Sequence, residues 1–170
     1  RVLYENYDMD KREAEDLLDF VAMATVCDVM SLTGENRILV KEGLKRIRHT
    51  KNIGLQALMQ ACNVQPENIS AYHFGYVLGP CVNATGRLDT ARHALRLFET
   101  GQETEAEEIA RDLVDLNQER KELTLQGVEM AKKLCEEGGY ENDPVLVLFL
   151  PDVHESIAGL IAGRIREMYN

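Results

Sequence analysis

The segment from Glu103 to Glu137 has the longest periodic pattern in the sequence, and it constrains the fold more than any other feature. Its apolar positions alternate at spacings of four and three residues, as expected for one face of a long helix. They are Ile109, Leu113, Leu116, Leu123, Met130 and Leu134. Arg120 and Gly127 occupy the same register and interrupt the seam. The pattern therefore favours a connecting helix over 103–139, whereas an oligomer formed through this heptad seam is not favoured.

Shorter helices are expected before this segment. Apolar residues recur at helical spacing within 35–49, 53–63 and 69–78, and again after Thr90. Asp89 is placed to cap the helix that begins at Thr90. Residues 1–102 are therefore expected to form a mostly helical unit.

The pattern changes after residue 139. Pro144 introduces an uninterrupted apolar run, Val145 to Leu150, whose length and flanking residues predict a strand buried on both faces. An amphipathic helix follows in 154–166. One strand and one helix cannot form a stable sheet domain, so 140–170 is expected to begin an α/β domain that is larger than this sequence. The predicted fold class is mainly α.

The composition is that of a globular protein with one sizeable core, since 45% of the residues are apolar and 28% are charged. The longest apolar run is too short to span a membrane, and the first residues lack a secretory pattern. The four cysteines are scattered without metal-ligand spacing, which favours reduced thiols over zinc ligands. A cytoplasmic protein without a membrane partner is expected.

Charge is unevenly distributed along the chain. The formal net charge is -10, which argues against a generic nucleic-acid coat. From Arg37 to Lys51, however, six basic residues face a single acid, Glu42, while nine acids lie between Glu99 and Glu122. A basic face and an acidic arm are therefore both expected, although solvated helix faces would give the same pattern.

The segment from Gly79 to Asp89 is predicted to be a polar loop with anion-binding chemistry. Gly79 and Pro80 are typical of a helix end, and Asn83 and Gly86 both tolerate positive φ. Arg87 offers a planar fork of donors suited to phosphate or carboxylate. The alternative is a plain connection between helices in which Arg87 is solvated or paired with an acid.

Asp28 is a candidate metal ligand, because it lies within a largely apolar run, Ala22 to Met30. Burying an isolated carboxylate costs several kcal/mol, so it must be neutral, paired or metal-bound. Alternatively, Asp28 stands at the end of an element and caps the turn that contains Ser31 and Thr33.

Five segments, in this order, resemble the RecJ-type single-stranded-DNA-specific exonucleases of the DHH/DHHA1 phosphoesterase superfamily. They are Ala24–Val29, Leu32–Arg37, Gly79–Arg87, Leu116–Arg120 and His154–Arg164. The resemblance covers nearly the whole chain. It implies the helical end of a DHH domain over 1–102, a connecting helix over 103–139 and the start of a DHHA1 domain over 140–170.

The resemblance also implies a function. Enzymes of this family digest single-stranded DNA from its five-prime end in recombination and repair, with two divalent metals, Mn²⁺ or Mg²⁺. Asp28 matches a metal ligand of the family. Asn83, Gly86 and Arg87 match the part that holds the substrate backbone, and His154 and Arg164 match the second-domain entrance, where DNA is also contacted. Other DNA-repair proteins are further expected partners.

Several residues depart from the family pattern. Cys81 stands where the family usually has an arginine, and Glu155 follows His154 where a Trp-His-Pro-Gly pattern is usual. The alternative role of His154 is capping or packing at a turn. The sequence contains no Asp-His-His triplet. This segment alone is therefore expected to be an inactive fragment of its parent enzyme.

Two other functions remain open. An acidic helical module without catalytic activity could bind a protein partner through the heptad seam or the basic face. Another DHH-type phosphoesterase could act on short oligonucleotides or cyclic dinucleotides.

Overall fold

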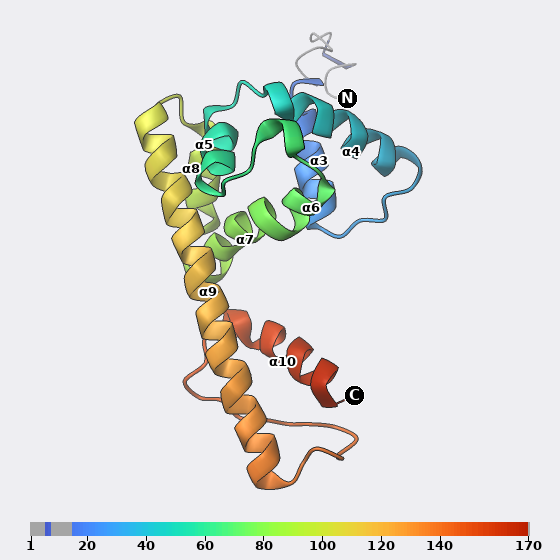
Figure 1. Ribbon diagram of the computed structural model, residues 1–170, viewed down its shortest axis with the longest axis vertical. Coiled ribbons are helices and arrows are strands. Elements are labelled where there is room, and N and C mark those ends of the chain that lie inside the picture. Colours follow the sequence, from blue (N-terminus) through green and yellow to red (C-terminus); the bar gives the residue numbers. More distant parts are fainter. Residues whose placement is uncertain (1–5, 8–14, 170) are drawn as a thin grey trace.

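The computed structural model describes residues 6–7 and 15–169, which are mainly α and include no β-strand (Figure 1). The helices are α3 (Leu18–Cys27), α4 (Gly34–Arg46), α5 (Ile53–Ala61), α6 (Ala71–His73), α7 (Gly79–Leu88), α8 (Ala91–Glu99), α9 (Glu103–Gly138) and α10 (Glu155–Tyr169). Three further turns are the 3₁₀ turns η1 (Ile47–His49) and η2 (Pro66–Asn68) and the π-helical turn η3 (Phe74–Leu78). The predicted fold class is confirmed.

Helix α9 forms the long axis of the molecule (Figure 1). It covers Glu103–Gly138, so the prediction of one long helix in this part of the chain is confirmed. The helix ends because Gly139 adopts a left-handed conformation, with φ of 68°. Its backbone N–H turns back to the carbonyls of Cys135 and Glu136, which satisfies acceptors that a helix end leaves free.

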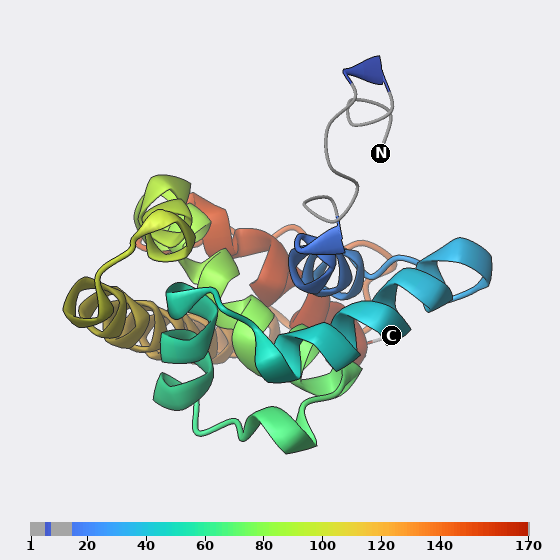
Figure 2. The same cartoon turned by 90° about the horizontal axis from the view of Figure 1, so that it is seen from above.

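Helices α3 to α8 pack around the N-terminal half of α9, and we call this part the upper unit. Its core consists of fully buried side chains, among them Leu55, Leu58, Phe74, Leu97 and Leu113. Helices α3 and α4 lie side by side (Figures 1 and 2). They approach closely at Gly43, where a Cβ atom would clash with the carbonyl of Leu18 and the side chain of Ala22.

The C-terminal half of α9 packs against α10 in a second, smaller cluster, and we call this part the lower unit. Ile157, Ile161 and Ile165 of α10 are buried against Val128 and Ala131 of α9. Their spacing of four residues places all three on one face of α10, as the sequence pattern predicted.

The segment 145–150, predicted to be a strand buried on both faces, does not form a strand. Val145, Val147 and Phe149 are 72%, 88% and 82% exposed, whereas Leu146, Leu148 and Leu150 pack against the lower cluster. The prediction is wrong on both points, the strand and its burial, because the described ranges contain no strand that could pair with this segment. Only one face is covered.

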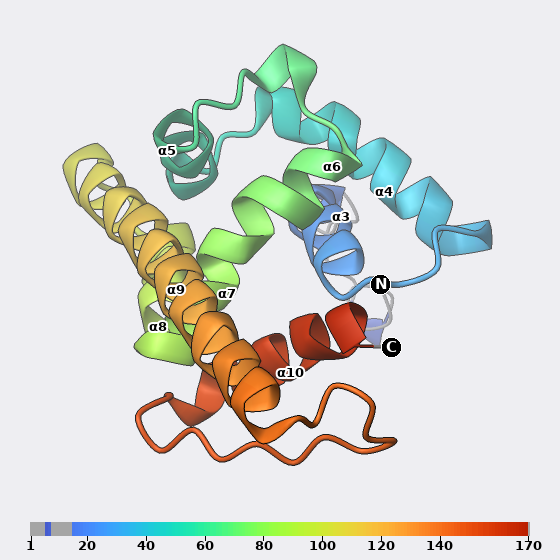
Figure 3. The same cartoon turned by 60° about the horizontal axis from the view of Figure 1, so that its bottom comes forward.

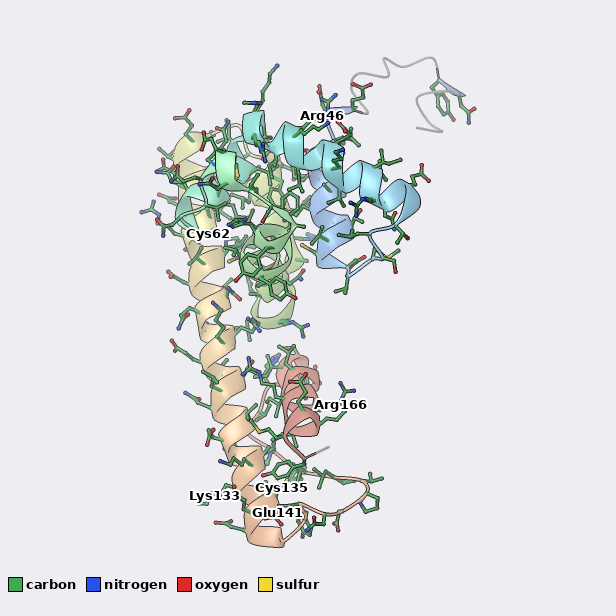
Figure 4. All side chains as sticks on the ribbon, turned by 45° about the vertical axis from the view of Figure 1, so that its right-hand side comes forward. Arg46, Cys62, Lys133, Cys135, Glu141 and Arg166 are labelled. Atoms are coloured by element: carbon green, nitrogen blue, oxygen red, sulfur yellow. The ribbon has the colours of Figure 1, made fainter. Side chains whose placement is uncertain are left out.

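Within residues 6–7 and 15–169, no helix combines the length and apolar character that a membrane crossing requires. All four cysteines are free thiols, as expected. Cys62 lies in the upper unit and Cys135 near the far end of α9 (Figure 4).

Candidate functional site

The segment predicted as a polar loop is helix α7, Gly79–Leu88, so that prediction is wrong. Among the described residues, positive φ occurs at Val29, Gly34, Asn63 and Gly139, and the expected positive φ at Asn83 and Gly86 is absent. Their backbone N–H groups lie inside a helix rather than in an outward-facing cradle.

A π-helical turn explains why Gly79 and Pro80 do not end the helix. In the turn η3, the N–H of Gly79 donates to the carbonyl of Phe74, five residues earlier. Proline has no N–H and its ring crowds the carbonyl four residues before it, which would normally break an α-helix. We attribute the continuity to the wider π turn directly before Pro80. Gly79 is required there because a Cβ atom would clash with Cys27 and with the carbonyl of Phe74.

Three arginines from three helices converge where the upper and lower units meet. They are Arg87 of α7, Arg120 of α9 and Arg164 of α10. Burial lowers the pKa of the Arg120 guanidinium, and the positive charges of Arg87 and Arg164 lower it further. Within 6–7 and 15–169, none of the three forms an ion pair with a carboxylate. We call these residues the arginine cluster.

Neutral groups hold the cluster in place. The Oδ1 atom of Asn117 accepts from Nε of Arg120 at 3.2 Å and from Nη2 at 3.0 Å. Asn117 is buried, and its Nδ2 donates to Sγ of Cys81 at 3.5 Å. Nη1 of Arg87 donates to the backbone carbonyl of Ser156, at the start of α10, at 2.6 Å. Amide and carbonyl oxygens orient these guanidinium groups without cancelling their charge.

Helices α7 and α10 lie on the same side of α9 (Figures 1 and 3). Because Arg87 bridges α7 to the start of α10, the structure brings two of the predicted DNA-contacting residues, Arg87 and Arg164, to the same junction. Asn83 and Gly86 lie elsewhere. Both line a hollow of about 330 Å³ between α7 and α8.

His154 makes a capping contact, which was the alternative to DNA contact. Its ring Nδ1 lies 2.7 Å from the hydroxyl oxygen of Ser156 and accepts from the Ser156 backbone N–H at 3.3 Å. These contacts join His154 to the first turn of α10, where backbone N–H groups lack helical partners. The side chain is exposed.

The prediction that Asp89 caps α8 is wrong. Thr90 is the N-cap, and its hydroxyl accepts from the backbone N–H of Arg92. Asp89 instead ends α7, and its carboxylate lies 3.1 Å from Nδ1 of His93.

Asp28 is exposed at the C-terminal end of α3. It stands at the end of an element, and its backbone N–H donates to the Ala24 carbonyl at 2.9 Å. Its carboxylate accepts no hydrogen bond from the described residues, so the expected cap of the turn with Ser31 and Thr33 does not form. The described residues contain no group of three His, Cys, Asp or Glu side chains arranged to hold a metal ion. Asp28 therefore supplies one carboxylate and not a complete metal site.

Sequence reasoning did not include Arg120 among the site residues. The signal was present, because Arg120 occupies a seam position of an otherwise apolar pattern. A charged residue at such a position is costly unless it has a function or a partner. Its neighbours Arg87 and Arg164 could not be known from that pattern, because they come from other helices.

Comparison with known proteins identifies similar sequences. No protein-family model matches the sequence. The single-stranded-DNA-specific exonuclease RecJ of Escherichia coli is 38% identical over 160 residues, which are 91% of this chain and 28% of that protein. RecJ of Thermus thermophilus is 36% identical over 149 residues, or 88% of this chain and 21% of that protein.

Solved structures give the same result. The crystal structure of Thermus thermophilus RecJ in complex with Mn²⁺ matches with a TM-score of 0.82 at 33% identity. The match covers 98% of this chain and 24% of that one. The sequence and fold match one segment of proteins that are named as DNA exonucleases. More particularly, the chain is a RecJ-type segment, which spans about 28% of the length of the first curated relatives it matches.

Proposed function

We propose that this chain is part of a metal-dependent exonuclease that degrades single-stranded DNA from the five-prime end, and that the arginine cluster binds the DNA backbone. The observation that carries the proposal is the convergence of Arg87, Arg120 and Arg164 without a carboxylate partner in the described ranges. The RecJ relatives are named as exonucleases specific for single-stranded DNA.

The electrostatics favour an anion at the cluster. Arg120 is half-buried and faces two other positive charges, which disfavour its own charged form. A phosphate group among the three guanidiniums would turn this repulsion into attraction and could accept several charge-assisted hydrogen bonds. Asn117 and the Ser156 carbonyl would keep Arg120 and Arg87 oriented for that contact.

The metal centre of the proposed enzyme would use Asp28 as one ligand. RecJ structures have been solved with Mn²⁺ and with Mg²⁺, cations that prefer oxygen ligands. Two such cations, when bound, activate a water molecule and neutralise charge on the phosphodiester. Because one exposed carboxylate is not a metal site, the other ligands would come from outside the described residues, and the chain alone would be inactive.

We also propose a division of the chain into three parts. Residues 1–102 would be the helical end of a DHH domain, 103–139 the interdomain helix and 140–170 the start of a DHHA1 domain. Two separate apolar clusters along α9 support this division. The exposed face of 145–150 supports the continuation of the last unit beyond these residues. A cytoplasmic location and contacts with other DNA-repair proteins belong to the same proposal.

The alternative of a helical module that binds proteins through the heptad seam has less support. Ile109 and Leu113 of that seam are buried within the chain itself and are not free for a partner. A DHH-type phosphoesterase acting on short oligonucleotides or cyclic dinucleotides would use the same arginines, and substrate length would distinguish it from the exonuclease.

The salt dependence of binding to a fluorescent oligothymidylate tests the proposal. Replacement Arg87→Ala should weaken binding and reduce the slope of log K against log salt by about 0.7, the value for one phosphate contact on a single strand. Arg111→Ala is the matched control, because Arg111 is an exposed arginine on α9 whose Nε donates to the Glu107 carbonyl. Equal slopes for the two variants would contradict the proposal.

Catalysis is tested separately, in a protein that also carries the remaining RecJ-type segments. Asp28→Asn should abolish Mn²⁺-dependent nucleotide release and leave DNA binding within a few-fold of wild type. Retained hydrolysis would exclude Asp28 as a metal ligand.

A further inference from the structure

Two exposed tyrosines stack on each other in the helix that leads into α7. The ring centroids of Tyr72 and Tyr76 lie 5.1 Å apart with an interplanar angle of 26°. Tyr72 is 63% exposed and Tyr76 is 74% exposed, so water covers most of this apolar surface. Tyr72 also makes an edge contact with the ring of His73. This arrangement is a preformed aromatic platform, which we call the tyrosine pair.

The tyrosine pair and Arg87 of the arginine cluster lie on one continuous helical segment. Helices α6 and α7 are continuous through the π turn η3. Tyr72 and Tyr76 lie on the exposed face of this segment, and Arg87 follows eleven residues after Tyr76. Residues between them, such as Phe74 and Leu78, are fully buried on the opposite side. The segment therefore carries the stacked rings near one end and the Arg87 guanidinium near the other.

The local backbone supports a specific role for this face. Tyr76 lies within the π turn, and such turns occur frequently at functional sites. The turn is fixed by packing, because Gly79 fits against Cys27 and the Cys27 thiol donates to the Phe74 carbonyl. The tyrosine pair is thus exposed on a rigid support rather than on a mobile loop.

We propose that the tyrosine pair is a subsite for unpaired nucleobases of the strand whose phosphates the arginine cluster binds. This inference rests on the proposed function. Stacking on aromatic rings is the usual way for proteins to hold single-stranded bases without reading their sequence. A nucleobase on the tyrosine pair would bury ring surface that is now exposed. The phosphates of the same strand would continue towards the arginine cluster.

The spacing fits a short stretch of DNA. Eleven residues separate Tyr76 from Arg87, which corresponds to roughly 16 Å along a helix. At about 3.4 Å between stacked nucleotides, this distance spans roughly five nucleotides. The site sizes of single-strand-binding grooves lie in the same range, about 4 to 16 nucleotides.

The test compares two ligands on the 170-residue chain. One is a decathymidylate labelled at one end, and the other is the same backbone with abasic sites in place of every base. The double replacement Tyr72→Ala/Tyr76→Ala should weaken decathymidylate binding about 5- to 100-fold, the range for one lost stacking contact. It should change binding of the abasic strand by less than 2-fold. Tyr72→Phe/Tyr76→Phe keeps both ring faces and should bind both ligands like wild type.

The outcomes distinguish the nucleobase subsite at the tyrosine pair from backbone binding at the arginine cluster. If Tyr72→Ala/Tyr76→Ala binds decathymidylate like wild type while Arg87→Ala is impaired, the nucleobase subsite is wrong and the backbone site stands. An equal loss on both ligands would also contradict base stacking. If the wild-type chain binds neither strand, the proposed DNA-binding function fails and takes the subsite with it. A circular dichroism melt within 2 °C of wild type excludes unfolding as the cause of any loss, because both side chains lie outside the core.

Discussion

The two halves of α9 serve two units that differ sharply in packing. The N-terminal half is one wall of a core formed with five other helices, where Leu55, Leu58 and Phe74 are fully buried. The C-terminal half packs against α10 and the segment 145–150. A hollow of about 520 Å³ remains there, lined by residues that include Leu146, Ile161 and Tyr169. The N-terminal half of α9 therefore lies in a closely packed core, whereas the apolar cluster at its C-terminal half is only partly covered by other residues.

Polar residues occupy the boundary between the two units. Between Leu113 and Val128, the buried positions of α9 include Asn117 and Thr124. The hydroxyl of Thr124 donates to the Arg120 carbonyl at 2.7 Å, and Asn117 holds the Arg120 guanidinium. The arginine cluster therefore lies where neither apolar core continues, and its charges are accommodated there.

Truncation of a buried side chain in the upper unit should reduce the unfolding free energy most. Phe74→Ala removes a fully buried ring from the core and should cost about 3 to 5 kcal/mol of unfolding free energy. Urea denaturation followed by circular dichroism measures the loss. Tyr76→Ala, two residues away and exposed, is the control and should stay within about 0.5 kcal/mol of wild type. Equal losses would mean that the upper core is not organised around Phe74.

A smaller and more local effect is expected in the lower unit. Ile161→Ala leaves a cavity between α9 and α10 and should cost about 2 to 4 kcal/mol locally. Hydrogen exchange of the α10 amides should accelerate, while amides around Leu58 should keep their protection. Equal acceleration in both units would show that they unfold as one and would remove the distinction between them.

The smallest effect concerns the junction of α8 and α9. Nε and Nη2 of Arg96 donate to the Glu105 carboxylate at 2.6 and 2.9 Å, and the Thr100 hydroxyl donates to the same group. The hydrogen bonds from Arg96 lower the pKa of Glu105, and the one from Thr100 lowers it further. The stabilisation is present above about pH 4.5 and is lost as the pH falls through the lowered pKa.

Glu105→Gln should therefore lower the stability at pH 7 by the small amount expected of an exposed pair, and the difference from wild type should vanish as the pH falls below about 4.5. Thermal melts of both proteins between pH 2.5 and 7 measure this. The lower unit, which does not contain the pair, should show the same hydrogen exchange in both proteins. An identical acidic limb in the two proteins would exclude a stabilising role for the pair.

The sequence predicted those features that depend on local periodicity. Helix α9 and the apolar face of α10 follow from spacings of three and four residues, which report burial on one side of a helix. The strand predicted over 145–150 was wrong, because a strand requires partner strands and the described residues contain none. The loop at Gly79–Asp89 was wrong, because a π turn lets the helix continue through Gly79 and Pro80.

Only part of the candidate site could be predicted from the sequence, because its three arginines come from three different helices. Local chemistry predicts Arg87 as an anion-binding residue, the resemblance adds Arg164, and the structure places both near Arg120. Asn83 and Gly86 were placed with Arg87 because they are close in sequence, but a helix turns them towards α8. The role of Asp28 as a metal ligand stays a prediction.

Binding of the DNA backbone by the arginine cluster, as proposed, can be observed at the arginine side chains themselves. Its most direct test is a nuclear magnetic resonance titration of the arginine Nε–Hε signals with decathymidylate. The signals of Arg87, Arg120 and Arg164 should shift in a saturable manner, whereas those of Arg111 and Arg48, which lie on other exposed faces, should not move. Shifts confined to Arg48 and its basic neighbours on α4, with the cluster unchanged, would contradict the account.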